Sequence, residues 1–598
     1  MMTSLTVNSE QGSEEIETLA AAIDAASTSS RSTGPGSTAF ATLPIEILSR
    51  IAGHVRIPSE LAYRDYDDES GVNSPELSTA FLNRSTSLLS LARSVSPFLA
   101  ADSSGTTIDP SEIAERADIF LRVSRFAQPE FETMFSNIQT KTTARAILDD
   151  LSAPPEARLP LLSHLLRLSL PALFRPHPKV NPQSGRVLSR PLGGDRGTSD
   201  WQDEAEDGWK REVGVAGVVL EIVLRLRREE VEDLWPLILP PLLSFLDDFT
   251  PSNRILGMHI LGALLERVDR SLLVRTGVGK VFEQSFDSIF SILSDSHTPR
   301  LLELAHPVAL SLLRLLYPRP PPLPSMVSSS SSLSTAAAAS ARSSTVQATS
   351  RAPLSAYATK RPLRSSSEPS PTDPSFLHFT AVHSLFSNSV LKSWEFKSGH
   401  YEIERVGLEA LANGIVDEMG PGAVRWFGVL VPHLCAIVDG AGEGGQGGEQ
   451  AIANEKLARL RLKAVEVLRL VVRAASGAPA ASGRDGLDGN ALADETGPPR
   501  GAGRVRVVEW TDKIGSSVAK CWIHCQEYRK RDRRTGEVAE AGSGVVERLE
   551  QELKALVRDL RGCRPRVADE DADSKQDFFG RLPDLDRAFE PLVRPEHE

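Results

Sequence analysis

The sequence predicts an all-α protein in which pairs of helices stack into a solenoid that long disordered inserts interrupt. Three observations carry this prediction. Over most of the 598 residues, apolar side chains recur at spacings of three and four, and few stretches alternate as strands do. One helix-to-helix turn recurs after 47 residues. Segments rich in Ser, Pro or Gly separate the helical parts.

Composition sets the expected domain boundaries, because low-complexity segments lack the apolar content that offsets the entropy of ordering a chain. The expected organisation is a disordered N-terminus (1–38), an N-terminal helical solenoid (39–317), a Ser/Pro-rich disordered insert (318–373), a C-terminal helical solenoid (374–562) with Gly-rich linkers at 439–450 and 476–503, and an acidic, disordered tail (563–598).

The bulk charge and the cysteines exclude several classes of protein. The formal charge of −12 is spread along the chain, which argues against direct nucleic-acid binding. Four unevenly spaced cysteines do not make a disulfide framework, so we expect a reducing compartment, cytoplasm or nucleus. The N-terminus lacks a signal-peptide pattern, and the run "GVAGVVLEIVL" is shorter than the ~20 residues that span a bilayer.

The first expected helix is "LPIEILSRIAGHV", from Leu43 to Val55. Its beginning resembles the first helix of an F-box, which would make the chain a ubiquitin-ligase substrate adaptor. The following "RIPSELAYRDYDDESG" does not supply the later helices of that module. A Pro-initiated amphipathic helix therefore explains the segment better.

The stretch "PLLSFLDDFTPSNRILGMHILGALLERV" (241–268) predicts two helices joined by an acidic turn. Asp247 and Asp248 could be a carboxylate pair for acid/base or metal chemistry. Adjacent residues at a helix end diverge, and the neighbouring sequence holds no His, Lys or third carboxylate to support that chemistry. We favour a turn that, beside Thr250, caps the following helix and complements its positive N-terminus.

The same turn recurs further along the chain. "LDDFTP" (246–251) matches "LSDSHTP" (293–299), after an apolar helix over 278–293 and before a helix that runs to about Tyr317 with Thr298 as its N-cap. The spacing is close to the ~40–47 residues of HEAT and armadillo helix-pair repeats. "VPHLCAIVDG" (431–440) is a noisier third copy. Gly257 and Gly262 fit a close approach of a neighbouring helix, or are simply tolerated.

No segment carries a convincing catalytic, metal-binding or cofactor motif. "CWIHC" (521–525) offers zinc-ligand atoms, but no second ligand pair follows, so small buried cysteines flanking Trp522 are the better interpretation. "GAGEGG" (440–445) follows a helix rather than a strand and is no dinucleotide fingerprint. Leucines spaced three and four apart over 546–560 predict a helix that docks on the solenoid or on a partner.

Several segments together resemble the Tel-two-interacting protein family, specifically its second member. The resemblance covers roughly Leu159 to Trp522, with inserts. The segments that carry it are "LFRPHPKVNPQSGR" (173–186), Trp209-Lys210, "LWPLILPPLLSFLDDFTPSNRILGMHILGALL" (234–265), "RTGVGKVFEQSFDSIFSIL" (275–293), "GLEALANGIVDEMGPGAVRWFGVLVPHL" (407–434) and "VVEWTDKIGSSVAKCW" (507–522). Within them, the residues expected to be structural are Pro241, Asp247, Asp248, Gly257, Thr276 and Gly277.

The resemblance implies a non-enzymatic scaffold without a cofactor, a subunit of the TTT co-chaperone complex. Its implied direct partners are the Tel-two protein and the first Tel-two-interacting protein. With heat-shock protein 90, such a complex supports the maturation and stability of phosphatidylinositol 3-kinase-related protein kinases, a role that extends to telomere maintenance. The resemblance implies no direct contact with nucleic acid or membrane.

The residues that contact a partner are expected in the C-terminal half, because Trp426, Trp510 and Trp522 look exposed and aromatic side chains often anchor interfaces. The competing interpretation is that all three tryptophans lie in the core, and it is the stronger one for Trp522. A helix-repeat nuclear transport factor is a further alternative to the TTT function.

Overall fold

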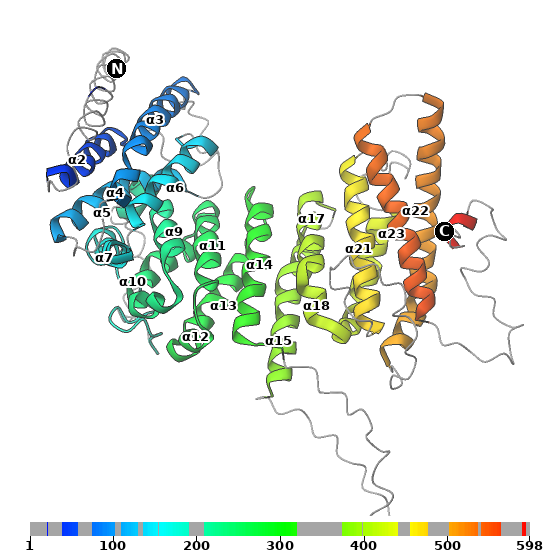
Figure 1. Ribbon diagram of the computed structural model, residues 1–598. Helices are drawn as coiled ribbons and strands as arrows, with labels where there is room; N and C mark the ends of the chain where they lie inside the picture. The colour runs from blue at the N-terminus through cyan, green and yellow to red at the C-terminus, as the bar shows by residue number, and fades with distance from the viewer. Residues whose placement is uncertain are drawn as a thin grey trace, which may run out of the picture.

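The computed structural model shows an extended row of helices (Figure 1). It describes residues 21, 39–57, 75–101, 109–128, 135–153, 155–189, 208–319, 373–397, 399–440, 455–476, 502–535, 540–563 and 589–593. The segments expected to be disordered at 1–38, 318–373, 439–450, 476–503 and 563–598 lie outside these residues except for their edges, Ala21 and the short stretch 589–593.

Every regular element in the described residues is a helix, which confirms the all-α prediction. The α-helices are α2 (Ala39–His54), α3 (Pro75–Val95), α4 (Pro97–Ala101), α5 (Pro110–Ser124), α6 (Ile138–Ser152), α7 (Pro155–His164), α8 (Gly208–Arg211), α9 (Val215–Arg225), α10 (Arg228–Leu246), α11 (Pro251–Leu265), α12 (Arg270–Thr276), α13 (Val278–Ile289), α14 (Thr298–Leu316), α15 (Pro374–Phe386), α16 (Lys392–Phe396), α17 (Tyr401–Ala410), α18 (Val416–Met419), α19 (Phe427–Asp439), α21 (Glu455–Ser476), α22 (Ala502–Thr535), α23 (Glu540–Gly562) and α25 (Glu590–Val593).

Short 3-10 and π-helical segments join some of these helices. They are η2 (Arg125–Ala127), η3 (Leu165–Ser169), η4 (Leu170–Ala172), η7 (Ser387–Leu391), η8 (Leu411–Ile415) and η9 (Gly420–Trp426). An isolated antiparallel bridge pairs Val180 with Val187.

The helices near the predicted repeat follow the sequence pattern closely. α14 occupies its expected segment, whereas α13 begins at Val278 as expected but ends at Ile289, four residues before the predicted end. The apolar side chains of α13 are buried. Thr298, however, is the first residue of α14 rather than its N-cap, which is His297. The Thr298 hydroxyl instead donates to the carbonyl of Ile292 at 3.2 Å, so it closes the preceding turn.

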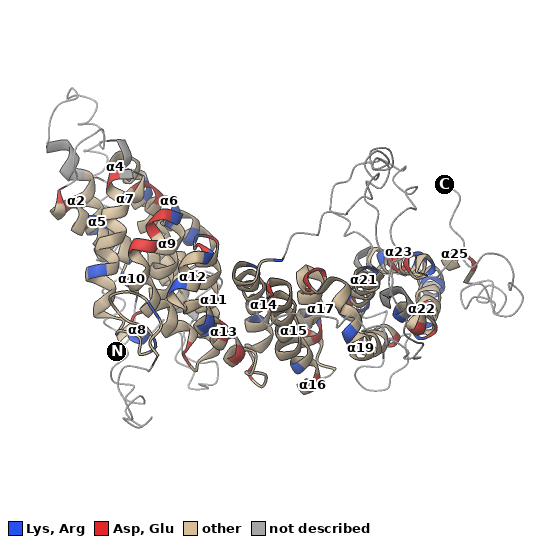
Figure 2. Cartoon of the chain, turned by 90° about the horizontal axis from the view of Figure 1, so that it is seen from below, with Lys and Arg blue, Asp and Glu red and all other residues tan. Residues whose placement is uncertain are grey.

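The helices lie in two layers (Figure 2): α13, α15, α16, α19 and α22 in one, and α14, α17, α21 and α23 in the other. Ser285 of α13 contacts Asp247 just after α10, and Arg275 of α12 contacts Glu232 near the start of α10. The segment formed by α12 and α13 therefore runs alongside α10 in the same direction.

The same pattern recurs at the C-terminal end of the row. Ser517 of α22 hydrogen-bonds to Cys435 of α19, and Lys520 pairs with Asp439 at 3.2 Å, so α19 and α22 are parallel. α23 packs on α21, as one of the two predicted docking modes requires, with Arg469 paired to Glu552 at 2.9 Å.

The C-terminal end of the row is covered by α25, which packs on the outer side of α23. Leu592 and Val593 are buried there, as is Phe589 just before them. The Arg561 guanidinium of α23 donates to the carbonyl of Val593 at 2.8 Å.

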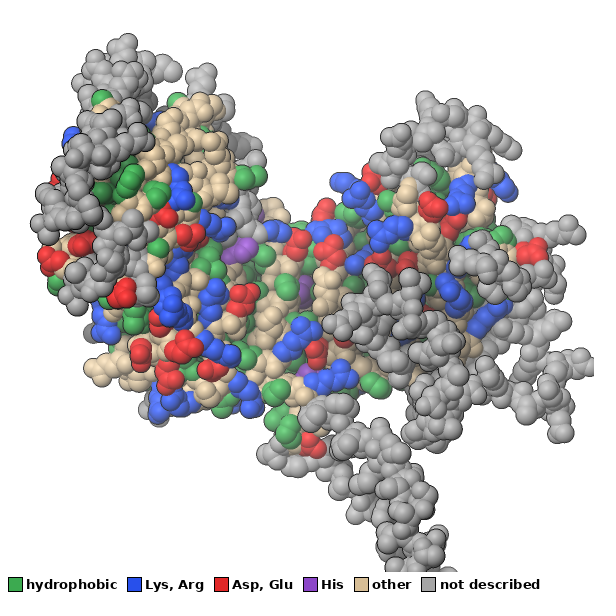
Figure 3. All heavy atoms as spheres, viewed as in Figure 1, with side chains coloured by type: hydrophobic (Ala, Val, Ile, Leu, Met, Phe, Trp, Pro, Cys, Tyr) green, Lys and Arg blue, Asp and Glu red, His purple; other side chains and the backbone are tan. Residues whose placement is uncertain are grey.

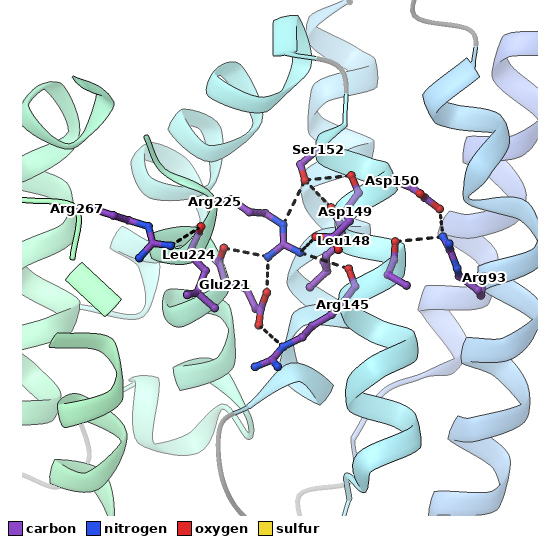
Figure 4. Close-up of polar contacts among 11 residues, drawn as sticks. Arg93, Arg145, Leu148, Asp149, Asp150, Ser152, Glu221, Leu224, Arg225 and Arg267 are labelled. Carbon is purple, nitrogen blue, oxygen red and sulfur yellow. Dashed lines mark hydrogen bonds and ion pairs between the residues drawn. The ribbon is translucent and has the colours of Figure 1, made fainter. Parts of the chain in front are cut away.

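An ion-pair network joins the N-terminal helices (Figure 4). The Glu221 carboxylate of α9, only 1% exposed, lies between Arg225 of α9 and Arg145 of α6, with 3.1 Å to the latter. Arg225 also reaches Asp149 at 2.6 Å and Ser152 at 3.2 Å. Both charges of the central pair therefore have several partners, as a buried ion pair needs.

One stretch of the described residues, Tyr401–Asp439, is long and apolar enough to cross a membrane by length and composition alone. It is not a straight helix, because the chain bends at Gly414 (φ 148°) and Gly420 (φ 51°). Its side chains Leu411 and Leu430 are completely buried in the core. Helices in a protein core satisfy the same criterion, which explains the hydropathy of this stretch.

Candidate functional site

Four of the six segments that carried the family resemblance meet at the corner between α10 and α11: 173–186, Trp209-Lys210, 234–265 and 275–293. α10 ends at Leu246, and α11 begins at Pro251, whose missing amide suits a first helical position. The Asp248 carboxylate accepts from the backbone amide of Thr250 at 2.8 Å and from the side chain of Asn253 at 3.3 Å. The corner therefore caps α11 through Asp248, as the capping interpretation predicts, while the Thr250 side chain makes no cap bond.

A short hairpin, residues 174–188, lies against this corner, and we call it the hairpin. The Asn181 side chain accepts from the amides of Gln183 and Ser184 at 2.8 and 3.2 Å, which closes the turn. Across the turn, the Leu188 amide donates to the Lys179 carbonyl at 2.9 Å.

The Asp247 carboxylate joins the corner to the hairpin and to α13. One carboxylate oxygen contacts Lys179 Nζ at 2.6 Å and His177 Nε2 at 3.2 Å, and the other accepts from Ser285 of α13 at 3.2 Å. Burial alone would raise the pKa of Asp247, but the hydrogen bonds from His177 and Lys179 and the Lys179 charge lower it to about 2. Asp247 thus connects three separate segments as a carboxylate.

Asp248 holds the other side of the corner. Its carboxylate pairs with Lys210 of α8 at 2.8 Å, and its carbonyl accepts from Arg254. The Lys210 ammonium lies 5.1 Å from the ring centre of Phe249 and 5.5 Å from that of Trp209, within cation–π range.

An aromatic cluster lies beneath these charges. Phe174 of the hairpin stacks on Trp209 of α8 with 5.8 Å between ring centres, and Trp209 meets the edge of Phe245 of α10 at 4.7 Å. All three rings are buried. The cluster explains why the Trp209-Lys210 pair and the hairpin accompany the α10–α11 corner.

The far end of the hairpin reaches α10 and the start of α13. A Cβ added to Gly185 would lie 2.5 Å from the ring of Trp235, so only glycine fits there. The Val187 amide donates to the Thr276 carbonyl at 2.9 Å. Gly277 follows with φ 75°, a left-handed conformation that ends α12 and starts α13.

The remaining predicted structural residues also lie in the core of this region. Pro241 is buried in α10. A Cβ added to Gly257 would lie 2.9 to 3.2 Å from atoms of Phe245 and Leu246, so the close approach of α10 explains this glycine. Gly262 is less constrained, with only Val308 at 3.3 Å.

The site is a protein surface whose charged side chains are held in place by ion pairs and hydrogen bonds. Asp247 and Asp248 are saturated by cations and hydrogen bonds, which leaves neither carboxylate poised for proton transfer. Among the residues that the structure describes, no group of three or more His, Cys, Asp or Glu could hold a metal ion. What the corner offers outward is the Phe249 ring, 74% exposed, beside Lys210. Such an aromatic and basic rim suits protein contact.

Sequence reasoning missed the partners of the two aspartates. It searched the neighbouring sequence for a His or Lys, whereas His177, Lys179 and Lys210 are 37 or more residues away along the chain and meet the corner only in the fold. The available signal was that both segments, 173–186 and Trp209-Lys210, stood among the family-like segments.

The predicted partner-binding tryptophans fall into two groups. Trp426, the last residue of η9, packs against His383 and Phe386 of α15, and Trp510 belongs to α22; both tryptophans are half-buried. The parallel register of α19 and α22 places Trp510 level with Gly428 and Val429, close to Trp426. Trp522 is 1% exposed, so it is a core residue of this chain, in agreement with the competing interpretation, and offers no surface to a partner.

Two other sequence motifs lie in the core. Cys521 and Cys525 are free thiols with no exposed surface, as the interpretation of small buried residues predicts. Ile45, Leu48 and Ile51 of α2 are buried, and α2 packs on α3 and α5. The apolar face of the segment that resembles an F-box helix is therefore covered by the chain itself.

Charged side chains of both signs are mixed over the face shown in Figure 3, and no single-sign patch dominates it. This distribution agrees with the spread charge of the sequence.

Comparison with families of known proteins finds a match to the Tti2 family over residues 119–441, which is 323 of the 598 residues. The matched segment contains the hairpin, α8 and the whole α10–α11 corner. A search of curated proteins finds no match.

Proposed function

Because the chain belongs to the Tti2 family, we propose that it is a non-enzymatic scaffold subunit of the TTT (Tel-two, Tti) complex. The observation that carries the proposal is the match over more than half of the chain, which includes every segment that meets at the hairpin and the corner. The proposed direct partners are the Tel-two protein and the first Tel-two-interacting protein.

The proposed architecture is a HEAT/armadillo-like solenoid. Its support is the contact of α10 with the segment formed by α12 and α13, which runs in the same direction: 38 residues separate Asp247 from Ser285, and 43 separate Glu232 from Arg275. Offsets near 40 residues are typical of helix-pair repeats. A solenoid suits a scaffold because its long surface can bind another extended protein without a dedicated pocket.

The proposed cellular role is co-chaperone work in the cytoplasm and nucleus. Acting with heat-shock protein 90, the complex would support the maturation and stability of phosphatidylinositol 3-kinase-related protein kinases, and through them telomere maintenance. In this role the hairpin and the corner hold the N-terminal helices in a fixed arrangement. The half-buried Trp426 and Trp510 contribute to the surface of the C-terminal half that binds a partner.

Affinity purification of the full chain from its native cells, followed by mass spectrometry, tests this function. The expected result is co-purification of the other two TTT subunits. Recovery of nucleoporins without those subunits would instead support a nuclear transport factor.

A variant that lacks residues 1–60 separates the proposal from the F-box alternative. A TTT subunit keeps its two partners after this deletion, whereas an F-box adaptor loses a ubiquitin-ligase subunit. Because the deletion removes α2, which packs on α3 and α5, circular dichroism must first show that the variant is folded.

Partner binding by the tryptophans is tested with Trp426→Ala and Trp510→Ala in the same purification. We expect each to weaken recovery of the first Tel-two-interacting protein. Phe396→Ala is the matched control, because Phe396 is a 59% exposed aromatic residue of the same layer. Unchanged recovery with both tryptophan variants would place the interface elsewhere.

A further inference from the structure

The C-terminal end of the row carries a short helix that is distant in sequence from the helix it covers. α25 packs on the outer side of α23 (Figure 1), and the 25 residues 564–588 lie between Cys563 and Phe589. Both helices follow residue 441, where the segment that matches the Tti2 family ends. The family match therefore assigns nothing to the contact between them.

Three apolar side chains hold α25 on α23. Phe589, Leu592 and Val593 are 7%, 3% and 8% exposed. Their spacing of i, i+3 and i+4 places all three on one face of a helical turn. An amphipathic helix that binds the apolar surface of another protein uses the same spacing.

A polar contact between the two helices engages the main chain of α25. The Arg561 guanidinium of α23 donates from Nη1 to the carbonyl of Val593 at 2.8 Å. Val593 is the last residue of α25, so its carbonyl has no partner within the helix, and a cation beside a helix C-terminus is favourable. Because the acceptor is a backbone carbonyl, this contact selects the end of a helix and not a particular side chain.

α25 has little stability of its own. Isolated helices shorter than about 12 residues are marginal in water. The ring of Pro591 would also clash with the carbonyl four residues before it, so the helix does not extend towards its N-terminal side. Docking on α23 must therefore offset the whole cost of ordering this segment. A helix that is already ordered within a partner protein does not carry that cost.

We propose that the outer side of α23 around Arg561 is a docking surface for an amphipathic helix of a partner protein, and that α25 occupies it until such a helix replaces it. The partner helix presents apolar side chains at i, i+3 and i+4 and places a carbonyl of its C-terminal end against Arg561. Docked there, it continues the row by one more helix, as neighbouring elements of a helical array do. The proposal is independent of the TTT function.

Binding of a labelled peptide to the full chain tests whether the surface accepts a separate segment. The probe is a fluorescein-labelled peptide of residues 584–598, followed by fluorescence anisotropy. Leu592→Asp in the full chain should expel α25, because a carboxylate is costly to bury, and this variant should bind the probe. The wild-type chain should bind it at least about tenfold more weakly, because the tether holds its own segment at an effective concentration on the order of 1 mM.

The control for this substitution is Leu168→Asp, at a leucine of η3 that is 65% exposed, and it should bind the probe as weakly as wild type. Circular dichroism first establishes that each variant is folded. A folded Leu592→Asp chain that does not bind the probe would overturn the proposal.

The role of Arg561 is tested within the Leu592→Asp chain. Adding Arg561→Met should weaken probe binding about two- to tenfold, because the bond to the helix end is lost. Arg558→Met, at an exposed arginine of the same helix, is the matched control and should leave binding unchanged. Equal affinities of these two double variants would mean that the probe binds elsewhere.

A second probe distinguishes a partner helix from the chain's own tail. With Pro591→Ala in the peptide, the three apolar side chains lie on a helix that can extend over further turns, as in a partner protein. This probe should bind the Leu592→Asp chain more tightly than the natural peptide does, whereas Pro595→Ala, outside the helical turn, should change nothing. Equal or weaker binding of the Pro591→Ala peptide would refute docking of a partner helix and leave the surface to the chain's own segment.

Sedimentation of the wild-type chain tests a second copy as the occupant. We expect a monomer at every concentration. A concentration-dependent dimer that Leu592→Asp abolishes would contradict the proposal, because the occupant would then be α25 of a second copy.

Discussion

At the scale of the residue, Asp247 has the most connections at the α10–α11 corner. One carboxylate joins the hairpin, the end of α10 and α13 through His177, Lys179 and Ser285. Sequence reasoning attributed the role of Asp247 and Asp248 to local capping. That attribution holds for Asp248 and misses Asp247, because long-range partners leave no trace in local sequence.

Asp247→Asn should destabilise the chain by about 1 to 2 kcal/mol at pH 7, because the amide cannot pair with Lys179 as an anion does. The pKa of Asp247 falls from 3.8 to about 2 on folding, so its stabilisation is fully present above pH 4 and disappears between pH 4 and 2. Urea unfolding at pH 7 and at pH 3 measures this: the difference between wild type and variant should shrink at pH 3. Asp233→Asn, on the exposed side of α10, should leave stability unchanged at both pH values.

Gly257→Ala should destabilise the chain by about 1 to 3 kcal/mol, because its Cβ would press on Phe245 and on the backbone of Leu246. Gly428→Ala is the opposite case: Gly428 also lies in a helix, but its Cβ would meet nothing within 4 Å. There, alanine should stabilise by up to about 1 kcal/mol through its better helix propensity. Thermal unfolding of the two variants compares them, and equal shifts would refute the close approach of α10.

At the scale of the element, helix existence was the easiest feature to predict. The stripe of α13, the Pro-started helices α11 and α14 and the docked helix α23 all follow from spacing and turn chemistry. The hairpin was not predicted, since it has neither helical periodicity nor strand alternation and is held by side chains from other elements. The ion-pair network of α6 and α9 was also invisible, because its partners are about 75 residues apart in sequence.

Glu221→Gln should cost about 2 to 4 kcal/mol, because it leaves Arg145 and Arg225 without their shared, buried anion. Glu232→Gln is the control: Glu232 pairs with Arg275 in the open, at 59% exposure, and such surface pairs contribute less than about 1 kcal/mol. Denaturant midpoints of the two variants should differ clearly, and similar midpoints would mean that the network adds no more than a surface pair.

Replacing residues 322–370 with a short flexible linker should leave the thermal midpoint within about 2 °C of wild type. The physical reason is that α14 and α15 contact each other directly, and the His378 ring is 2.7 Å from the Tyr317 carbonyl, so the joint is made by residues outside the insert. His378→Ala is the contrasting variant and should lower the midpoint. Loss of folding after the linker replacement would show that the insert contributes to the core.

At the scale of the whole molecule, burial of histidines predicts sensitivity to mild acid. Burial lowers the pKa of His259, His306 and His433 from 6.5 to about 4. Below about pH 6.5 these histidines are therefore protonated in the unfolded chain, whereas in the folded chain they stay neutral down to about pH 4. Stability must fall as the pH drops through this window.

The thermal midpoint should thus decrease between pH 7 and 4.5, with about 1 to 3 kcal/mol of the loss due to His306, which is 2% exposed and stacks on Phe290. His306→Gln removes this titration and should flatten the pH profile. His54→Gln is the control at a half-exposed position on α2. A wild-type midpoint that is constant over this range would contradict the buried, neutral histidines.

The cover that α25 forms over α23 has a consequence for how the chain is made. A ribosome releases the helices in order, and each new pair can settle on the pair before it. The outer side of α23 is the exception, because Phe589, Leu592 and Val593 leave the exit tunnel some 30 residues later. A nascent or prematurely stopped chain that ends before Phe589 leaves the side of α23 that α25 covers exposed to solvent, where chaperones and proteases that bind apolar surface can reach it.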